Sequence, residues 1–317
     1  MIFYRRFNVC RYYSVVIIFI LMCSLFISFW FPFSVQFAIV HNFLAGEIVD
    51  FTGADNETGF DTFIIPNVVH FVRLENHQMN FVDMISLKAA FLHQSPEKVV
   101  IHCDCHTLHG KYWEMVKDLP GLEIKFIHKP THVFGQKLSS VHHASDIARL
   151  KILMSEGGIF LENDVYIVKP LDSFLKFEMA IGWPPDQPLG TQVILAHKNA
   201  RFLKLWYQSY KYYKPDRLYY NAGELPTQMI LRKQPNLVHR VPYEFGVRNL
   251  SYFLYGVHRT DWENFHAIHL SRNKAHLASN VMREEFDEEN IKTYNKTFGD
   301  MARLVLFGKT QMVVKSN

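Results

Sequence analysis

A helix, a turn and a strand in the middle of the chain restrict its possible folds most strongly. Residues 140–154 carry apolar side chains at helical spacing, and Gly157-Gly158 offers the left-handed stop with which helices often end. The apolar run 159–161 then leads into Glu162-Asn163-Asp164. Alternate side chains of an extended strand point the same way, so the carboxylates of Glu162 and Asp164 can converge on one hard cation. The segment predicts an acidic metal site at a strand end.

The rest of the chain from residue 63 alternates expected strands and helices. Strands are expected at 64–72, 98–102, 123–127, 192–196 and 237–241, helices at 83–91, 112–117, 140–154, 199–213 and 298–308, and a turn at 223–226. Such alternation is typical of an α/β fold with a mostly parallel sheet and flanking helices. Ligands of these sheets bind at the carboxyl ends of strands, where the acidic pair is expected to lie.

The N-terminal part predicts a membrane anchor. Residues 15–33 form an uncharged run rich in Ile, Phe and Leu, and crossing a bilayer takes roughly 20 residues. Three arginines precede the run and no Lys or Arg follows it until Arg73, so the tail is expected in the cytosol. A cleaved signal peptide would have a shorter apolar core and a small-residue cleavage site.

The expected organisation is a cytosolic tail at 1–14, a transmembrane signal-anchor at 15–37, a stem at 38–62 and a luminal domain at 63–317. Sequons at Asn56, Asn249 and Asn295 fit luminal exposure. A net charge of +4 over 317 residues gives no sign of a nucleic-acid partner.

Two of the four cysteines, Cys103 and Cys105, fall in the expected luminal domain. A bridge across a single residue would be strained unless the backbone is unusual, so free thiols are expected. A metal site that adds His102 and His106 lacks a familiar zinc spacing.

Residues 146–172 resemble the sugar-binding region of DXD-motif glycosyltransferases. The resemblance rests on the S-D-x-x-R helix, the G-G turn, the acidic pair and the K-P-L-D tail at 169–172. This group, glycosyltransferase family 32, includes yeast initiating α-mannosyltransferases and animal lactosylceramide α-galactosyltransferases. Residues 65–70 are similar to the family's opening strand, and Glu162 stands at the first position of D-x-D.

The resemblance implies a GT-A-like, Rossmann-type domain in the Golgi membrane. It implies a hexosyltransferase that uses Mn²⁺ and a nucleotide sugar, UDP-linked, to modify a glycan or glycolipid with retention of configuration. Asp164 would then bind the metal, and Glu162 the metal or the donor nucleotide. A rival hypothesis, favoured by Glu162, is an inactive luminal protein of the same fold that binds glycans or acts as a scaffold.

Five further residues are candidates for the site. By the resemblance, Asp146 contacts the donor and Arg149 orients the acidic pair, although residues three apart on a helix can also form a plain surface ion pair. A late histidine, His269, is a candidate third metal ligand or a core residue. Glu224 and Asp186, each in a Pro- and Gly-bounded segment, are candidate catalytic carboxylates or members of ordinary loops.

Overall fold

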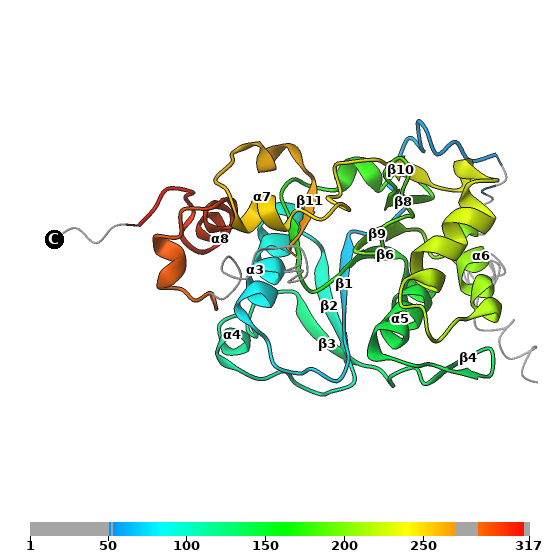
Figure 1. The fold of residues 1–317 in the computed structure, drawn as a ribbon, viewed down its shortest axis with the longest axis horizontal. Coiled ribbons are helices and arrows are strands. Elements are labelled where there is room, and N and C mark those ends of the chain that lie inside the picture. Colours follow the sequence, from blue (N-terminus) through cyan, green and yellow to red (C-terminus); the bar gives the residue numbers. More distant parts are fainter. Residues whose placement is uncertain (1–50, 52, 271–284, 314–317) are drawn as a thin grey trace, which may run out of the picture. The chain divides into compact units, whose positions relative to one another are not determined.

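The structure is a computed structural model that describes residues 51, 53–270 and 285–313 (Figure 1). By compactness the chain divides into Met1–Asp50 and Phe51–Asn317, and all described residues belong to the second unit. Residues 51–61, expected as part of the stem, therefore lie in the same unit as the predicted domain, and the domain division stays a prediction.

A seven-stranded sheet with the order β10-β8-β9-β6-β1-β2-β3 forms the centre of this unit. Its strands, in chain order, are β1 (Val68–Arg73), β2 (Lys98–Cys103), β3 (Leu122–Phe126), β6 (Gly158–Leu161), β8 (Met179–Gly182), β9 (Val193–Ala196) and β10 (His239–Val241). Neighbouring strands run parallel except where β9 pairs with β6 and β8. The expected α/β fold with a mostly parallel sheet is confirmed.

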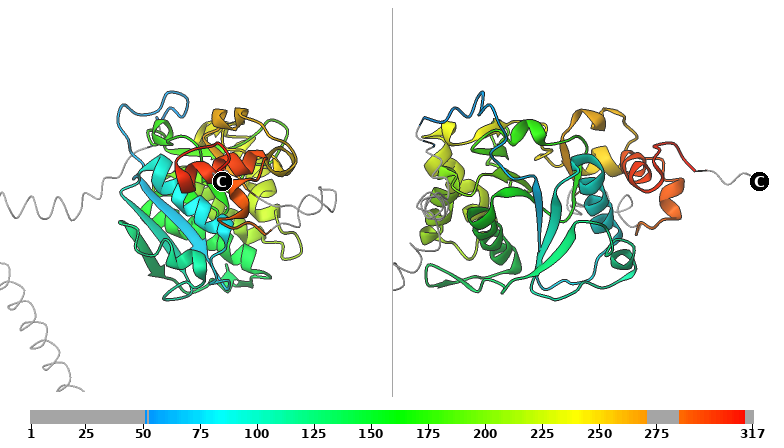
Figure 2. Two further views of the ribbon diagram at one scale, coloured as in Figure 1. Left: turned by 90° about the vertical axis from the view of Figure 1, so that its left-hand side faces the viewer. Right: turned by 180° about the vertical axis from the view of Figure 1, so that it is seen from behind.

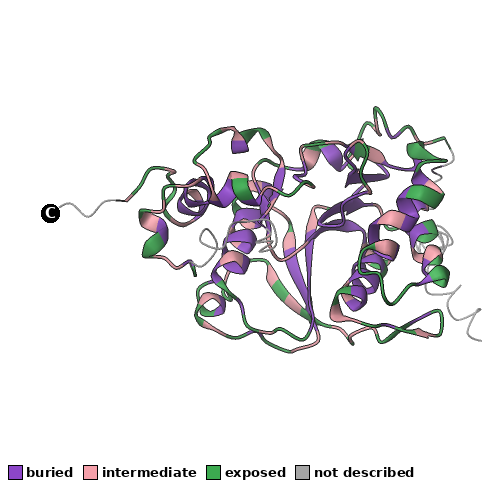
Figure 3. Ribbon diagram, in the orientation of Figure 1, coloured by how far each residue is buried: buried purple, intermediate pink, exposed green. Residues whose placement is uncertain are grey.

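Helices cover both faces of the sheet (Figures 1 and 2). One face packs against α5 (Val141–Glu156) and α6 (Arg201–Ser209), and the other against α3 (Phe81–Ala89), α7 (Ser251–Tyr255) and α8 (Thr297–Phe307). The short α4 (Lys111–Glu114) follows β2. Alternation along β6 feeds both cores: Ile159 and Leu161 join one, and Phe160 joins the other. The central strands are buried throughout (Figure 3).

Glycines fix the junction between α5 and β6, as expected. Ser140 caps the start of α5 by accepting a hydrogen bond from the backbone N–H of His143. At the other end Gly157 and Gly158 have φ of 69° and 108°, values that favour glycine. A Cβ at Gly158 would lie 2.7 Å from the backbone oxygen of Val68. The turn therefore lets β6 pair with β1, and this pairing places the acidic residues at the carboxyl end of the central strand.

A second, two-stranded sheet was not expected from the sequence. In it β7 (Val165–Ile167) pairs antiparallel with β11 (Ala267–His269), with His269 opposite Val165. A small hairpin of β4 (His132–Val133) and β5 (Gln136–Lys137) precedes α5. The β7–β11 pairing brings a segment near residue 269 beside the residues that follow β6.

Two local expectations are wrong. Instead of a turn, residues 223–226 continue π-helical turns at Tyr220–Glu224 and Thr227–Leu231. A Cβ at Gly223 would lie 2.3 Å from the ring of Tyr219, so the absence of a side chain permits this packing. Cys103 and Cys105 form a disulfide rather than free thiols. Their Cα atoms are 5.0 Å apart, within the range that a disulfide spans.

The predicted membrane anchor at 15–37 lies outside the described residues. Within the part that the structure does describe, no helix combines the length and apolar character needed to cross a bilayer. Asn249 and Asn295 are exposed, whereas Asn56 is buried and donates a hydrogen bond to the backbone oxygen of Asn236. The folded unit thus leaves two of the three sequons accessible.

Candidate active site

Three potential metal ligands lie close together beyond the carboxyl end of the central strand β6: Glu162, Asp164 and His269. The carboxylates follow the end of β6, and the β7–β11 pairing delivers the histidine. Nε2 of His269 lies 3.0 Å from Oδ1 of Asp164 and 3.5 Å from Oε2 of Glu162. The potential ligand atoms of the three side chains all lie within 4.8 Å of one another. The structure thus brings together the three residues predicted to hold a metal.

Charge in this cluster is mutually stabilising. Burial raises the pKa of Asp164, but the hydrogen bond and charge of His269 outweigh burial and hold that pKa below its usual value. Burial likewise opposes the charged form of His269, yet its bond to Asp164 and the two carboxylates raise its pKa. The site therefore favours a positive charge between two carboxylates, which a metal cation would supply in place of the imidazole proton.

Arg149 connects the acidic cluster to the helix beneath it. One guanidinium nitrogen donates to Oε1 of Glu162 and to the backbone oxygen of Thr191, each at 3.0 Å, and the other lies 3.2 Å from Oδ1 of Asp146. The guanidinium also covers the ring of Phe160 at 4.6 Å. Both Arg149 and Asp146 are buried, and burial raises the pKa of Asp146 despite the nearby guanidinium. The pair is therefore not the surface ion pair of the alternative interpretation, because both side chains are buried and Arg149 also binds Glu162.

A cavity of about 1090 Å³ opens beside this cluster. Its lining comes from the loop between β1 and α3, the first turns of α5, the acidic segment, α4 and residues 285–287. Glu162, Asn163 and Asp164 all line it, as do His142, Ser145 and Arg149 from α5. A cavity of this size and mixed lining suits a ligand as large as a nucleotide sugar.

Neither predicted catalytic carboxylate lines this cavity. Asp186 lines a separate cavity of about 330 Å³ with Trp183 and Arg240 among others. Glu224 forms an ion pair with Arg217. His266, three residues before His269, does not join the acidic cluster, and its Nδ1 lies 3.0 Å from the backbone oxygen of Pro170. The catalytic roles of Asp186 and Glu224 stay predictions.

Two residues of the cavity wall were not expected from the sequence. Arg73, at the end of β1, donates to Asp83 at 2.6 Å, and both side chains are buried. Asp83 also forms a capping box with Asn80 at the start of α3. The N-x-x-D pattern before an apolar run was the signal that could have located this helix start. The Arg73–Asp83 ion pair therefore links the end of β1 to the first turn of α3.

The family comparison identifies the central region. Residues 93–180 match the family described as "Glycosyltransferase sugar-binding region containing DXD motif". A central region of the chain therefore matches the DXD-type glycosyltransferase model. The matched segment contains Asp146, Arg149, Glu162 and Asp164, so the resemblance inferred from these residues is confirmed, and the family match supports the expected enzyme class, a glycosyltransferase.

Individual relatives of this glycosyltransferase region are distant. "Glucan organizing enzyme 1" of Cryptococcus neoformans is 24% identical over 166 residues, which cover 47% of this chain and 44% of that protein. The chain thus aligns with less than half the length of that relative.

Two similar solved structures are also glycosyltransferases. The PaToxG glycosyltransferase is 18% identical and covers 54% of this chain and 70% of its own, with a TM-score of 0.38. The apo form of GlyE from Streptococcus pneumoniae is 11% identical and covers 80% and 66%, with a TM-score of 0.43.

Proposed function

We propose that this protein is a metal-dependent, retaining glycosyltransferase that moves a hexose from a UDP-linked nucleotide sugar to a glycan or glycolipid. The observation that carries the proposal is the convergence of Glu162, Asp164 and His269 beside a cavity of about 1090 Å³, two of these residues within the matched sugar-binding region. The sequence alone predicted that Glu162 and Asp164 lie together. The fold places the imidazole of His269 beside them, next to a cavity large enough for a donor.

The donor set fits a divalent cation. Carboxylate oxygens suit Mg²⁺ and Mn²⁺, and the imidazole is a ligand that favours a transition metal, so we propose Mn²⁺. Asp164 and His269 would hold the ion, with Glu162 as a third ligand or a contact to the donor nucleotide. A metal bound here supplies charge neutralisation for the departing diphosphate.

The protein's own residues prepare the site for the reaction. Arg149 holds Glu162 through a 3.0 Å hydrogen bond and is itself fixed by Asp146 and Thr191, so the acidic group is oriented before a donor arrives. Asp186 and Glu224 do not line the cavity, which leaves no carboxylate among them to act as a nucleophile at the donor carbon. Attack by the acceptor hydroxyl on the face from which the diphosphate leaves, with retention, requires no such nucleophile.

The rival proposal is an inactive protein of the same fold that binds glycans or a partner. Its support is Glu162 in place of the family's aspartate. The longer side chain still reaches Arg149 at 3.0 Å and His269 at 3.5 Å. Since the acidic group keeps its place in the cluster, the geometry favours the enzyme.

We further propose a type II protein of the Golgi membrane with this unit in the lumen. The support is the uncharged run at 15–33, preceded by Arg5, Arg6 and Arg11.

The deciding experiment is a donor screen. Full-length protein in detergent is incubated with a panel of UDP- and GDP-sugars, with and without Mn²⁺, and hydrolysis and transfer to glycan acceptors are measured. We expect Mn²⁺-dependent turnover of a UDP-hexose, reduced by at least about 100-fold in Asp164→Asn. Asp118→Asn, an exposed carboxylate outside the cavity, is the matched control and should behave as wild type. Wild type that neither binds a nucleotide nor differs from Asp164→Asn would favour the inactive protein.

A further inference from the structure

Asp104, between the two disulfide cysteines, holds a loop that belongs to the cavity. Its Oδ1 accepts a hydrogen bond from Nε2 of His77 at 2.7 Å. The backbone N–H of Glu75 donates to both carboxylate oxygens, at 3.1 and 3.3 Å. Asp104 lies just after β2, whereas both donors lie in residues 74–80, which connect β1 to α3. The carboxylate thus joins the ends of two neighbouring strands.

Residues 74–80, here called the wall loop, form one side of the cavity. Five of its seven residues line the cavity: Leu74, Asn76, Gln78, Met79 and Asn80. On its inner side Arg73 donates to the backbone oxygens of Asn76 at 3.0 Å and Gln78 at 2.8 Å. The wall loop is therefore held between Arg73 and Asp104, and the residues between these two supports face the ligand space.

The wall loop needs this support because its backbone is unfavourable at Glu75. This residue has φ of 66°, a left-handed conformation that a non-glycine residue adopts only when its surroundings impose it. Its N–H is the group that Asp104 binds. The backbone of His109 adds two hydrogen bonds, to His77 and Met79. Without Asp104, the left-handed turn loses the contact that compensates for its cost.

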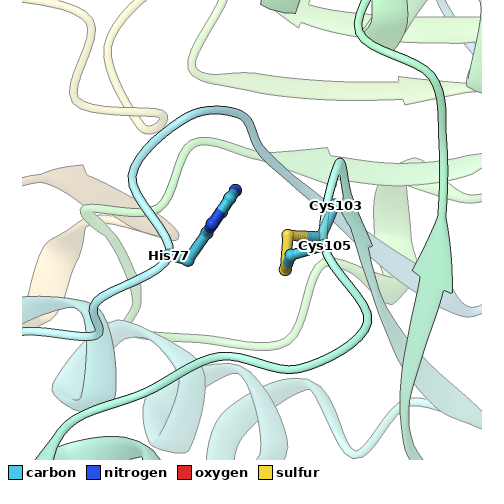
Figure 4. A group of neighbouring side chains, drawn as sticks. All are labelled: His77, Cys103 and Cys105. Atoms are coloured by element: carbon cyan, nitrogen blue, oxygen red, sulfur yellow. A yellow bond between two sulfur atoms is a disulfide. The ribbon is translucent and has the colours of Figure 1, made fainter.

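The disulfide fixes the position of Asp104. Cys103 is buried at the end of β2, and its bond to Cys105 spans only the aspartate. A ring this small removes little entropy from the unfolded chain, so its main effect is local. Figure 4 shows His77 beside the bridge, and its ring nitrogen lies within 4.8 Å of the sulfur atoms. The bridge thus restrains the backbone on both sides of the carboxylate that binds the wall loop.

We propose that the Cys103–Cys105 disulfide and Asp104 are a positioning element for the donor cavity, and that donor affinity depends on the oxidised state of the bridge. The donor part of this inference rests on the proposed function. A dithiol reductant delivers two electrons and two protons, which yields two thiols and the oxidised reductant. Asp104 then loses its restraint, the wall loop gains freedom, and the donor must order it on binding.

The test compares four variants of the full-length protein with wild type. Cys103→Ser/Cys105→Ser removes the bridge, Asp104→Asn weakens the carboxylate contacts, and Asp104→Glu is the conservative replacement. Glu75→Gln is the matched control, because it removes the side-chain ion pair with Lys129 and keeps the backbone N–H that Asp104 binds. Wild type treated with a dithiol serves as an additional sample.

Amide hydrogen exchange of residues 74–80 is the first measurement, because it requires no activity and the loop contains no proline. We expect about tenfold faster exchange in the double cysteine variant, in Asp104→Asn and in the dithiol-treated protein. Glu75→Gln should match wild type, and Asp104→Glu should restore part of the protection. Unchanged exchange after loss of the bridge would overturn the positioning element, whether or not the protein proves to be a transferase.

Steady-state kinetics with the donor found in the screen is the second measurement. A positioning role predicts that KM for the donor rises about tenfold while kcat stays within about twofold, because binding now has to order the wall loop. A fall in kcat with unchanged KM would contradict it. If wild type shows no turnover, the proposed function fails, and the exchange result alone decides the positioning element.

Discussion

Two of the three groups in the described part of this unit that place potential metal ligands within 4.8 Å of one another differ in access and in charge. Glu162, Asp164 and His269 lie beyond the carboxyl end of β6 beside a large cavity. His70, His102 and Glu156 lie on the α5 side of the sheet, with both imidazoles buried. Both clusters therefore hold potential ligands close together. They differ in whether a cavity gives access to them and in the charge of their side chains.

The second cluster is built to stay neutral. Nε2 of His70 donates to the backbone oxygen of Gly157 at 3.0 Å, so its Nδ1 accepts the proton of Nε2 of His102. Nδ1 of His102 has no hydrogen-bond partner among the described residues. Glu156, the carboxylate of the group, is already paired with Lys125 at 2.6 Å. A cation would find one free nitrogen and a neutralised carboxylate here. In the first cluster Glu162 is likewise paired with Arg149, but Asp164 contacts His269 and no Lys or Arg among the described residues.

The histidine pKa is shifted in opposite directions in the two clusters. At the cavity two carboxylates raise the pKa of His269. In the core, burial and the neighbouring His70 lower the pKa of His102 to about 4. The same side chain is stabilised as a cation in one place and as a neutral ring in the other. This contrast teaches that a histidine near a carboxylate indicates a metal site only when the carboxylate is not already satisfied.

The largest expected effect tests the dependence of the cavity cluster on Arg149. Arg149→Met leaves Asp146 buried and Glu162 half-buried without their cation. Removing one member of a buried ion pair costs about 3–5 kcal/mol, so the free energy of unfolding should fall by that amount in urea titration. The matched control is Arg217→Met, which breaks the half-exposed pair with Glu224 and should cost less than about 1 kcal/mol. Equal losses in both variants would mean that the cavity cluster does not need its buried cation.

The next effect tests the neutral core cluster through pH. The pKa of His102 is about 4 in the folded chain and near 6.5 when unfolded, so the unfolded chain binds more protons between these values. Stability should be intact above pH 6.5 and fall by about 3 kcal/mol towards pH 4. His102→Gln keeps a donor for His70 and does not titrate, so it should remove that part of the fall. Urea unfolding across this pH range measures the difference.

The exposed His128 supplies the control for this titration. His128→Gln should leave the acid-induced loss as large as in wild type. Charged groups around the core cluster are Glu156, which favours protonation, and Lys125 and Lys98, which oppose it. An identical pH profile in His102→Gln and wild type would show that the loss comes from other groups.

The main sheet could be predicted from the sequence because most of its strands contain apolar runs that lie between helical segments. β2 and β3 fall within about a residue of their expected ends, and α5 agrees with its Ser140 cap and Gly157-Gly158 stop. β8 and the β7–β11 pair escaped prediction, although the equally short β9 and β10 were expected. Length alone therefore does not explain the difference, and among the described strands β7 and β11 in addition pair only with each other, about a hundred residues apart. Such a pair depends on partners far along the chain, which a local pattern does not contain.

The same limit applies to the site. Glu162 and Asp164 are neighbours in sequence and could be paired by strand geometry alone. His269 joins them only through a pairing of segments about a hundred residues apart, and the sequence left it undecided between metal ligand and core residue. The role of Asp104 was invisible, because its partners Glu75 and His77 lie in another loop. Contacts between residues close in sequence could therefore be predicted, whereas contacts between residues from distant segments could not.

The smallest expected effect tests how well the cavity cluster is adapted to Glu162. Glu162→Asp restores the family's D-x-D but withdraws the carboxylate by one methylene from Arg149 at 3.0 Å and His269 at 3.5 Å. We expect kcat/KM for the donor to fall by about tenfold, equivalent to about 1.4 kcal/mol. Asn163→Asp, which adds a carboxylate to the same segment without shortening Glu162, is the comparison variant. A rise in activity with Glu162→Asp would instead mark Glu162 as a damaging departure and support the inactive protein, because a site adapted to glutamate gains nothing from a shorter acid.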